Sequence, residues 1–168
     1  MRAGYSRFFE KQARELSGHI ICEVWDIKDK RWILVDPDRE LVDLKPRDFE
    51  YASDAFTKLK KKRFKVKKYT ASVGKGFKGS VYLMLLDASF VLNNEKLYYN
   101  LPEILHQNIN NPRDIDPETL SDLEEIADHF KNLDSHLKDL NRVFYTNNSF
   151  KPSGLDYDGF SELISKNQ

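Results

Sequence analysis

Apolar residues are patterned as in strands near the start of this chain and as in helices further along it. Two short segments, "ICEVWDI" and "RWILVD", are rich in β-branched and aromatic residues and flank the charged turn "KDK". Such runs are typical of two strands joined in a hairpin. The opening "GYSRFF" carries aromatic residues that suit a further short strand. The first part of the chain therefore predicts a small antiparallel sheet.

After Pro46 the spacing of apolar residues becomes helical. Residues 46–64 place four of them on one stripe, and Asp48 stands where it could cap the helix. The stripe consists of Phe49, Ala52, Phe56 and Leu59. The segment "SVYLMLLDASFVLNN", residues 80–94, is apolar on nearly every side, which predicts a buried helix following Ser80.

Two more helices are predicted toward the end of the chain. The segment "DPETLSDLEEIADHF" has Asp116 at a cap position and Pro117 in the first turn. The segment "DSHLKDLNRVFY" spaces its apolar residues for a last helix. These core positions are Leu120, Leu123, Ile126, Ala127 and Phe130 in the former, and Leu137, Leu140 and Phe144 in the latter.

Strands come first and helices follow, without repeats or linkers, so the sequence predicts a single α+β domain. We expect this domain to span residues 1–155, with a β-rich part at 1–45 and a helical part at 46–155. We expect the tail, residues 156–168, to be weakly ordered.

Composition narrows the classes of function. Acidic and basic residues cancel at 27 each, so bulk charge favours no charged partner. No apolar run approaches the ~20 residues of a membrane helix, and the N-terminus lacks the apolar centre of a signal peptide. A single cysteine excludes an internal disulfide and suits a reducing, cytoplasmic location. Four histidines and one cysteine without paired spacing argue against a structural zinc site, and we expect no cofactor.

His19 and Asp36 stand at opposite ends of the predicted hairpin. Because side chains alternate along a strand, His19 shares a face with Trp25, and Cys22 lies on the other face. An even-numbered loop would pair Trp25 with Trp32 and bring Asp36 to the His19 face. A carboxylate there could hold the imidazole tautomer and stabilise the imidazolium, as in a catalytic triad.

The same alternation argues against Cys22 as a nucleophile, since a thiol must lie within roughly 3 Å of its base. We interpret Cys22 as a small core residue. A plainer interpretation of the hairpin also stands: His19 and Asp36 could be the polar ends of a core ribbon, with Asp36 serving the turn before Pro37.

The segments "RAGYSRFF", "HIICEVW" and "RWILVDP" resemble the bacterial transglutaminase-like family, which shares the transglutaminase and papain-like core. The matching positions are Arg2, Gly4, Tyr5, His19, Cys22, Glu23, Trp25, Trp32, Val35 and Asp36. The helical region that follows is also similar, so the resemblance covers about Arg2 to Gly154. Gly18 and Ile20 depart from the family pattern, in which an acid and an aromatic residue are usual.

The resemblance implies a cysteine hydrolase or acyltransferase acting on an amide or ester, with His19 as base and Asp36 as its orienting partner. The family's nucleophilic cysteine lies upstream of the Arg-x-Gly strand, and this sequence has no counterpart of it. We therefore expect an N-terminally truncated portion of such an enzyme, inactive alone. A non-catalytic interaction module or decayed remnant is the alternative. We also expect the uncovered apolar surface to find a second copy or a complementing chain.

Residues 58–78 offer a rival signal, because they carry ten Lys or Arg and no acid. Interleaved aromatic residues could stack bases while the lysines bind phosphates. A solvated helix end followed by a charged loop explains the same residues, and we favour that interpretation over nucleic-acid binding. Within this stretch "GKGFKG" matches a G-x-G-x-x-G pattern, but no dinucleotide-binding arrangement surrounds it, so we predict a flexible loop.

Overall fold

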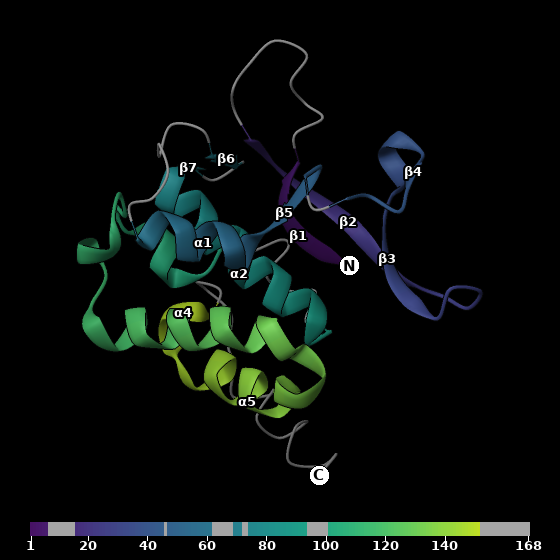
Figure 1. Cartoon of the computed structure of the whole chain (residues 1–168). Coiled ribbons are helices and arrows are strands. Elements are labelled where there is room, and N and C mark those ends of the chain that lie inside the picture. The colour runs from purple at the N-terminus through teal and green to yellow at the C-terminus, as the bar shows by residue number, and fades with distance from the viewer. Residues whose placement is uncertain (7–15, 46, 62–68, 72–73, 94–100, 152–168) are drawn as a thin grey trace.

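The computed structural model describes residues 1–6, 16–45, 47–61, 69–71, 74–93 and 101–151. It is an α+β structure, in which strands come mainly first and the longer helices later (Figure 1). The strands are β1 (Arg2–Ser6), β2 (Leu16–Asp26), β3 (Arg31–Asp36), β4 (Leu41–Val42), β5 (Phe49–Tyr51), β6 (Tyr69–Ala71) and β7 (Gly74–Lys75). The α-helices are α1 (Ala52–Lys60), α2 (Gly76–Val91), α4 (Pro117–His129) and α5 (Leu133–Thr146). The fold class predicted from the sequence is thus confirmed at the level of α+β. The expected tail lies outside the described residues.

Five strands form a continuous path in the order β4-β3-β2-β1-β5, and all pairs along it are antiparallel. At one end β6 pairs with β2 in parallel and with β7 in antiparallel fashion. The hairpin of β2 and β3 has Trp25 opposite Trp32, as the alternation of side chains predicted. Their rings meet edge to face, with centroids 5.6 Å apart.

The two faces of the sheet bury different side chains. Ala3, Tyr5 and Ile20 face the helices and join the main core, in which α2 is the central helix. Successive side chains alternate, so Gly4, His19 and Ile21 belong to the opposite face, which we name the outer face. Ile21 packs there with Leu44 and Phe49 in a second, smaller core. Figure 1 shows β3 and β4 on the side of the sheet away from α4 and α5.

Gly4 allows β5 to approach β1 closely. A Cβ at this position would collide with the carbonyl oxygen of Glu50 and lie 2.6 Å from Cζ of Phe49. Glycine therefore lets the Phe49 ring pack against β1 at the position of Gly4 and join the second core.

Two helices, α1 and α2, begin at residues other than those predicted from the sequence. The helix expected from Pro46 begins only at Ala52, and Phe49–Tyr51 is a strand paired with β1. Tyr51 occupies the N-cap position of α1, while Asp48 instead accepts a hydrogen bond from the backbone N–H of Lys45. Pairing with β1 outweighs the helical spacing because it supplies backbone hydrogen bonds to a segment buried on both sides.

The buried helix also begins earlier than its predicted start at Ser80. Helix α2 begins at Gly76, so Gly76–Gly79 forms its first turn instead of a loop. Gly76 has φ of 61°, a value that favours glycine. The two last helices follow the prediction: Asp116 caps α4 by accepting the backbone N–H of Thr119, and α5 covers the expected segment. Leu137 is the exception, because it is exposed.

None of the helices among the described residues is long and apolar enough to cross a membrane.

Candidate functional site

His19 and Asp36 lie in contact on the outer face. Nε2 of His19 is 2.8 Å from Oδ2 of Asp36, and both side chains are buried. When Nε2 carries a proton it donates to this carboxylate, and Nδ1 is then the unprotonated nitrogen of the neutral ring. The geometric part of the sequence-based prediction, a carboxylate within hydrogen-bond reach of the imidazole, is therefore confirmed.

Strand register produces this contact. Cys22 is opposite Val35 in the β2–β3 ladder, so Ile21 is next to Asp36 and His19 lies two residues further along the same face. Directly after Asp36 the chain enters the short 3₁₀ turn η1 (Pro37–Arg39), which ends β3 at this point. The proline at the first turn position fixes the direction in which the chain leaves the strand.

Asp36 is incompletely satisfied. Its Oδ2 accepts from His19 and lies 3.7 Å from Nε of Arg39. Its Oδ1 is buried, and within the described part of the chain it has no hydrogen-bond partner. A buried carboxylate oxygen without a partner is costly, because it has lost its water without replacement. The site therefore holds an acceptor with capacity for one more donor or cation.

Cys22 does not belong to this pair. It is half-buried, and alternation along β2 places its side chain on the face opposite His19. The prediction that Cys22 is not the partner of His19 agrees with this register.

A second group of charged residues lies where β1 begins. Arg2 donates through Nε and Nη2 to the two carboxylate oxygens of Asp87, each at 3.0 Å, and through Nη1 to Glu23 at 3.0 Å. Its guanidinium lies over the rings of Tyr51 and Phe130, at 4.4 and 5.2 Å from their centroids. Burial opposes the charge on Arg2, but the Asp87 carboxylate raises its pKa above the ordinary value. Arg2 is thus a fixed cation.

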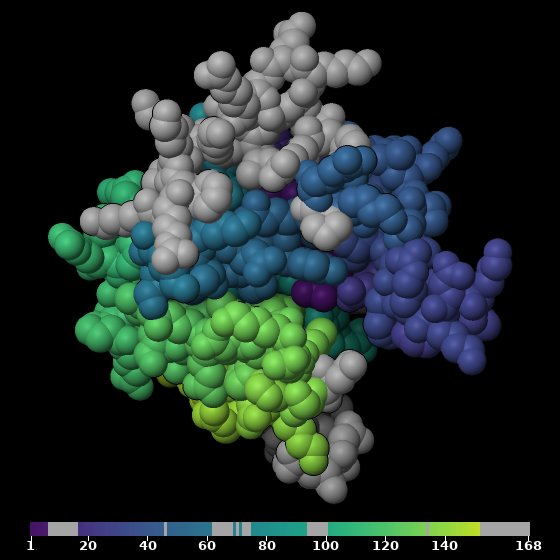
Figure 2. Space-filling view, viewed as in Figure 1, coloured from purple at the N-terminus to yellow at the C-terminus, as the bar shows by residue number. Residues whose placement is uncertain are grey.

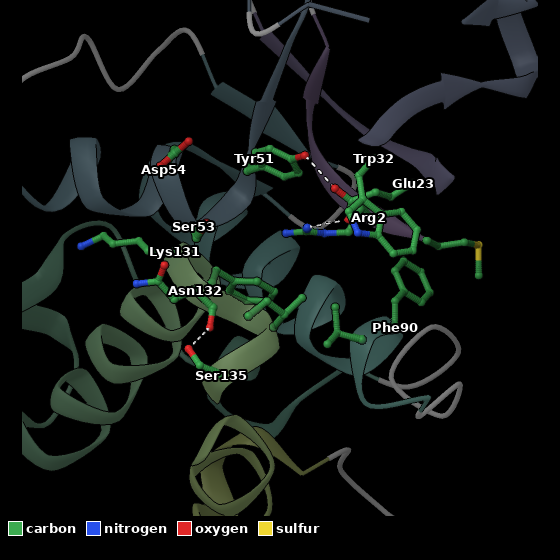
Figure 3. A pocket seen from close by; sticks show the side chains of 14 residues that line it. Arg2, Glu23, Trp32, Tyr51, Ser53, Asp54, Phe90, Lys131, Asn132 and Ser135 are labelled. Carbon is green, nitrogen blue, oxygen red and sulfur yellow. Dashed lines mark hydrogen bonds and ion pairs between the residues drawn. The ribbon is translucent and has the colours of Figure 1, made fainter. Parts of the chain in front are cut away.

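This group forms one wall of a pocket of about 710 Å³. Figure 3 shows Glu23, Tyr51 and Trp32 grouped around Arg2, while Lys131, Asn132 and Ser135 line the opposite side. The hydroxyl of Tyr51 donates a hydrogen bond to Oε1 of Glu23 at 3.3 Å. Burial, helped by Glu23, raises the pKa of Tyr51 to about 12, so this hydroxyl stays protonated at neutral pH.

Neither this pocket nor a smaller one of about 510 Å³ beside Trp32 and Phe49 is lined by His19 or Asp36. We name the larger pocket, around Arg2, Tyr51 and Trp32, the aromatic pocket. It is a separate feature from the pair of His19 and Asp36.

One signal in the sequence points to Asp87: it is the one acid within residues 80–94, the apolar segment predicted as a buried helix. A lone carboxylate in such a helix needs a buried cation. The pairing of His129 with His136 was also missed. Their Nδ1 atoms lie 3.1 Å apart, and this contact depends on how α4 and α5 pack.

Nine of the 21 residues of the basic stretch at 58–78, and five of its ten Lys or Arg, lie outside the described residues. Of its first lysines, Lys58 forms an ion pair with Glu50 at 2.8 Å and Lys60 pairs with Glu124. These two lysines serve contacts within the protein, in line with the favoured interpretation of the stretch as protein surface. Figure 2 shows α1 and α4 side by side, and Lys60 and Glu124 belong to these two helices.

Comparisons of the chain with models of protein families, with curated proteins and with solved structures found no match.

Proposed function

We propose that this chain supplies the base and the orienting acid of a transglutaminase-like thiol hydrolase or acyltransferase. The observation that carries the proposal is the 2.8 Å approach of His19 Nε2 to Asp36 Oδ2 in a buried setting. His19 acts as general base through Nδ1. Asp36 is a positioning residue that holds the imidazole tautomer and stabilises the imidazolium.

The proposed reaction is acyl transfer from an amide or ester. Nδ1 of His19 removes the proton of a thiol, and the thiolate attacks the carbonyl carbon of the substrate. The imidazolium then returns the proton to the leaving amine or alcohol as the thioester forms. Water or another amine completes the transfer by attacking the thioester.

The thiol in this scheme is not Cys22, which faces away from His19. The proposal therefore requires a cysteine that this sequence does not contain, brought by a complementing chain or segment. Without that thiol we expect the chain alone to be inactive toward amides and esters.

An added small thiol tests the proposal. The chain, kept in EDTA, is mixed with p-nitrophenyl acetate and 2-mercaptoethanol, and release of nitrophenol is followed. We expect thiol-dependent release that falls at least about tenfold in His19→Ala, less than the roughly 10²-fold of a positioned base because the thiol diffuses freely. His106→Ala, which changes an exposed histidine, is the matched control. Equal rates for the unchanged protein and His19→Ala would refute the proposal.

A second candidate function is that of a non-catalytic interaction module, favoured by exposed apolar side chains around the β2–β3 hairpin. They are Val24, Trp25, Ile27, Trp32 and Val42. The end of this hairpin projects away from the helices (Figure 1). This candidate predicts a second copy bound through the hairpin, so light scattering should show a dimer that Trp25→Ser and Trp32→Ser dissociate while His19→Ala does not. A monomer at the highest concentration would contradict it.

A further inference from the structure

A third side chain joins His19 and Asp36 on the outer face. Asp38 follows Pro37 in the 3₁₀ turn, and one ligand atom from each of His19, Asp36 and Asp38 lies within 4.8 Å of the others. Glu40 closes the turn with a left-handed backbone, φ of 56°. The turn thus returns Asp38 toward the end of the strand that carries His19.

The burial of these groups differs in a way that suits an ion. Asp36 is 0% exposed and His19 is buried, whereas Asp38 is exposed. An ion could therefore enter past Asp38 and reach the two inner groups. The buried Oδ1 of Asp36, which lacks a partner among the described residues, supplies an acceptor that a cation would satisfy.

The charges at the cluster also favour a cation. Asp36 and Asp38 carry two negative charges, and Arg39, with its Nε 3.7 Å from Oδ2 of Asp36, offsets one of them. Counted over these described residues, the cluster keeps a net negative charge.

We propose that His19, Asp36 and Asp38 bind one divalent transition-metal ion, for which Zn²⁺ is the best probe. An imidazole nitrogen with two carboxylate oxygens is a ligand set that Zn²⁺ accepts, and three protein ligands leave a fourth position for water. Ions that prefer six or more oxygen ligands, such as Ca²⁺, fit it poorly.

A metal bound to Nε2 of His19 replaces the proton that this nitrogen donates to Asp36, so the ion and the hydrogen bond exclude each other. Asp36 is then able to bind the ion through Oδ1 as well as Oδ2. This site goes beyond the proposed base role and does not depend on it. Bound Zn²⁺ is expected to suppress the thiol-dependent reaction by withdrawing His19, whereas absence of that reaction would leave metal binding unaffected.

Calorimetric titration of the EDTA-treated, dialysed full chain with ZnCl₂ tests the proposal. We expect one bound ion per chain and a dissociation constant that rises at least about tenfold in Asp38→Asn, since even the loss of a residue that only supports a ligand costs 10–100-fold. Because Asp38 is exposed, this variant should keep the fold, which its melting temperature checks. Arg39→Gln, which removes the opposing charge, should bind Zn²⁺ more tightly.

Two control variants exclude other donors. Cys22→Ser removes the single thiol. His136→Ala breaks the contact with His129, and these two histidines with Glu125 form the other group of histidines near a carboxylate. Both should bind Zn²⁺ with unchanged affinity. The proposal is overturned if the unchanged protein binds no Zn²⁺, if Asp38→Asn binds it equally well, or if His136→Ala abolishes binding.

Discussion

Arg2 and Asp87 are 85 positions apart in the sequence and form a two-point ion pair that joins β1 to α2. Asp87 is fully buried and also accepts the backbone N–H of Ala3 at 2.9 Å. The pair therefore fixes where the first strand begins against the central helix. It also sets the position of the guanidinium that forms part of the aromatic pocket.

Replacing Asp87 by Ala should destabilise the protein strongly. The change leaves the buried guanidinium of Arg2 with Glu23 as its remaining acid, and breaking a buried pair in this way costs about 3–5 kcal/mol. Urea unfolding followed by circular dichroism measures the loss.

The double variant Arg2→Met/Asp87→Leu is the control for that experiment. It removes both charges, so its free energy of unfolding should fall less than that of Asp87→Ala. A loss below about 1 kcal/mol in the single variant, typical of an exposed pair, would contradict the structure.

Gly4→Ala should destabilise the sheet by about 1–3 kcal/mol, because the added Cβ meets Glu50 and the Phe49 ring. The comparison variant is Gly18→Ala on the neighbouring strand, where the Cβ would lie 3.1 Å from the flexible end of Leu83 and 3.3 Å from Cα and Cβ of Ala71, so that smaller shifts relieve the contacts. Thermal unfolding of both variants gives the comparison. Equal melting temperatures would show that β5 does not lie across β1 as described.

Ionisation of Tyr51 should make the protein less stable at alkaline pH. Burial and Glu23 raise its pKa to about 12, against an ordinary value near 10. Between these values the folded state holds a proton that the unfolded state has lost, so the free energy of unfolding falls as the pH rises from about 10 to about 12.

Tyr51→Phe provides the test of this pH dependence. The variant should show a smaller fall in stability over the same range, and it should lack one late step in the tyrosinate absorbance titration. Loss of amplitude near pH 10 instead of near pH 12 would mean that Tyr51 ionises like an exposed phenol.

Alternation of side chains together with an even-numbered loop predicts the register of β2 and β3. The pairing of Trp25 with Trp32 and the contact of His19 with Asp36 both follow from it. These features are local, because a short turn joins the two strands and leaves few other registers.

Features that depend on distant parts of the chain were not predicted. The segment Phe49–Tyr51 has helical spacing, and only its pairing with β1 makes it a strand. The partner of Asp87 is likewise set by the packing of β1 on α2. His19 and Asp38 are far apart in the sequence, and only the fold brings them together in the cluster that we propose as a metal site.

The central claim is that Asp36 accepts the Nε2 proton of His19 and leaves Nδ1 to act as base. Two-dimensional ¹H–¹⁵N NMR of the imidazole at neutral pH in EDTA tests it most directly. We expect the neutral His19 ring to carry its proton on Nε2, with a slowly exchanging, low-field proton signal that Asp36→Ala removes. A neutral ring protonated on Nδ1, or an Nε2 signal unaffected by Asp36→Ala, would contradict it.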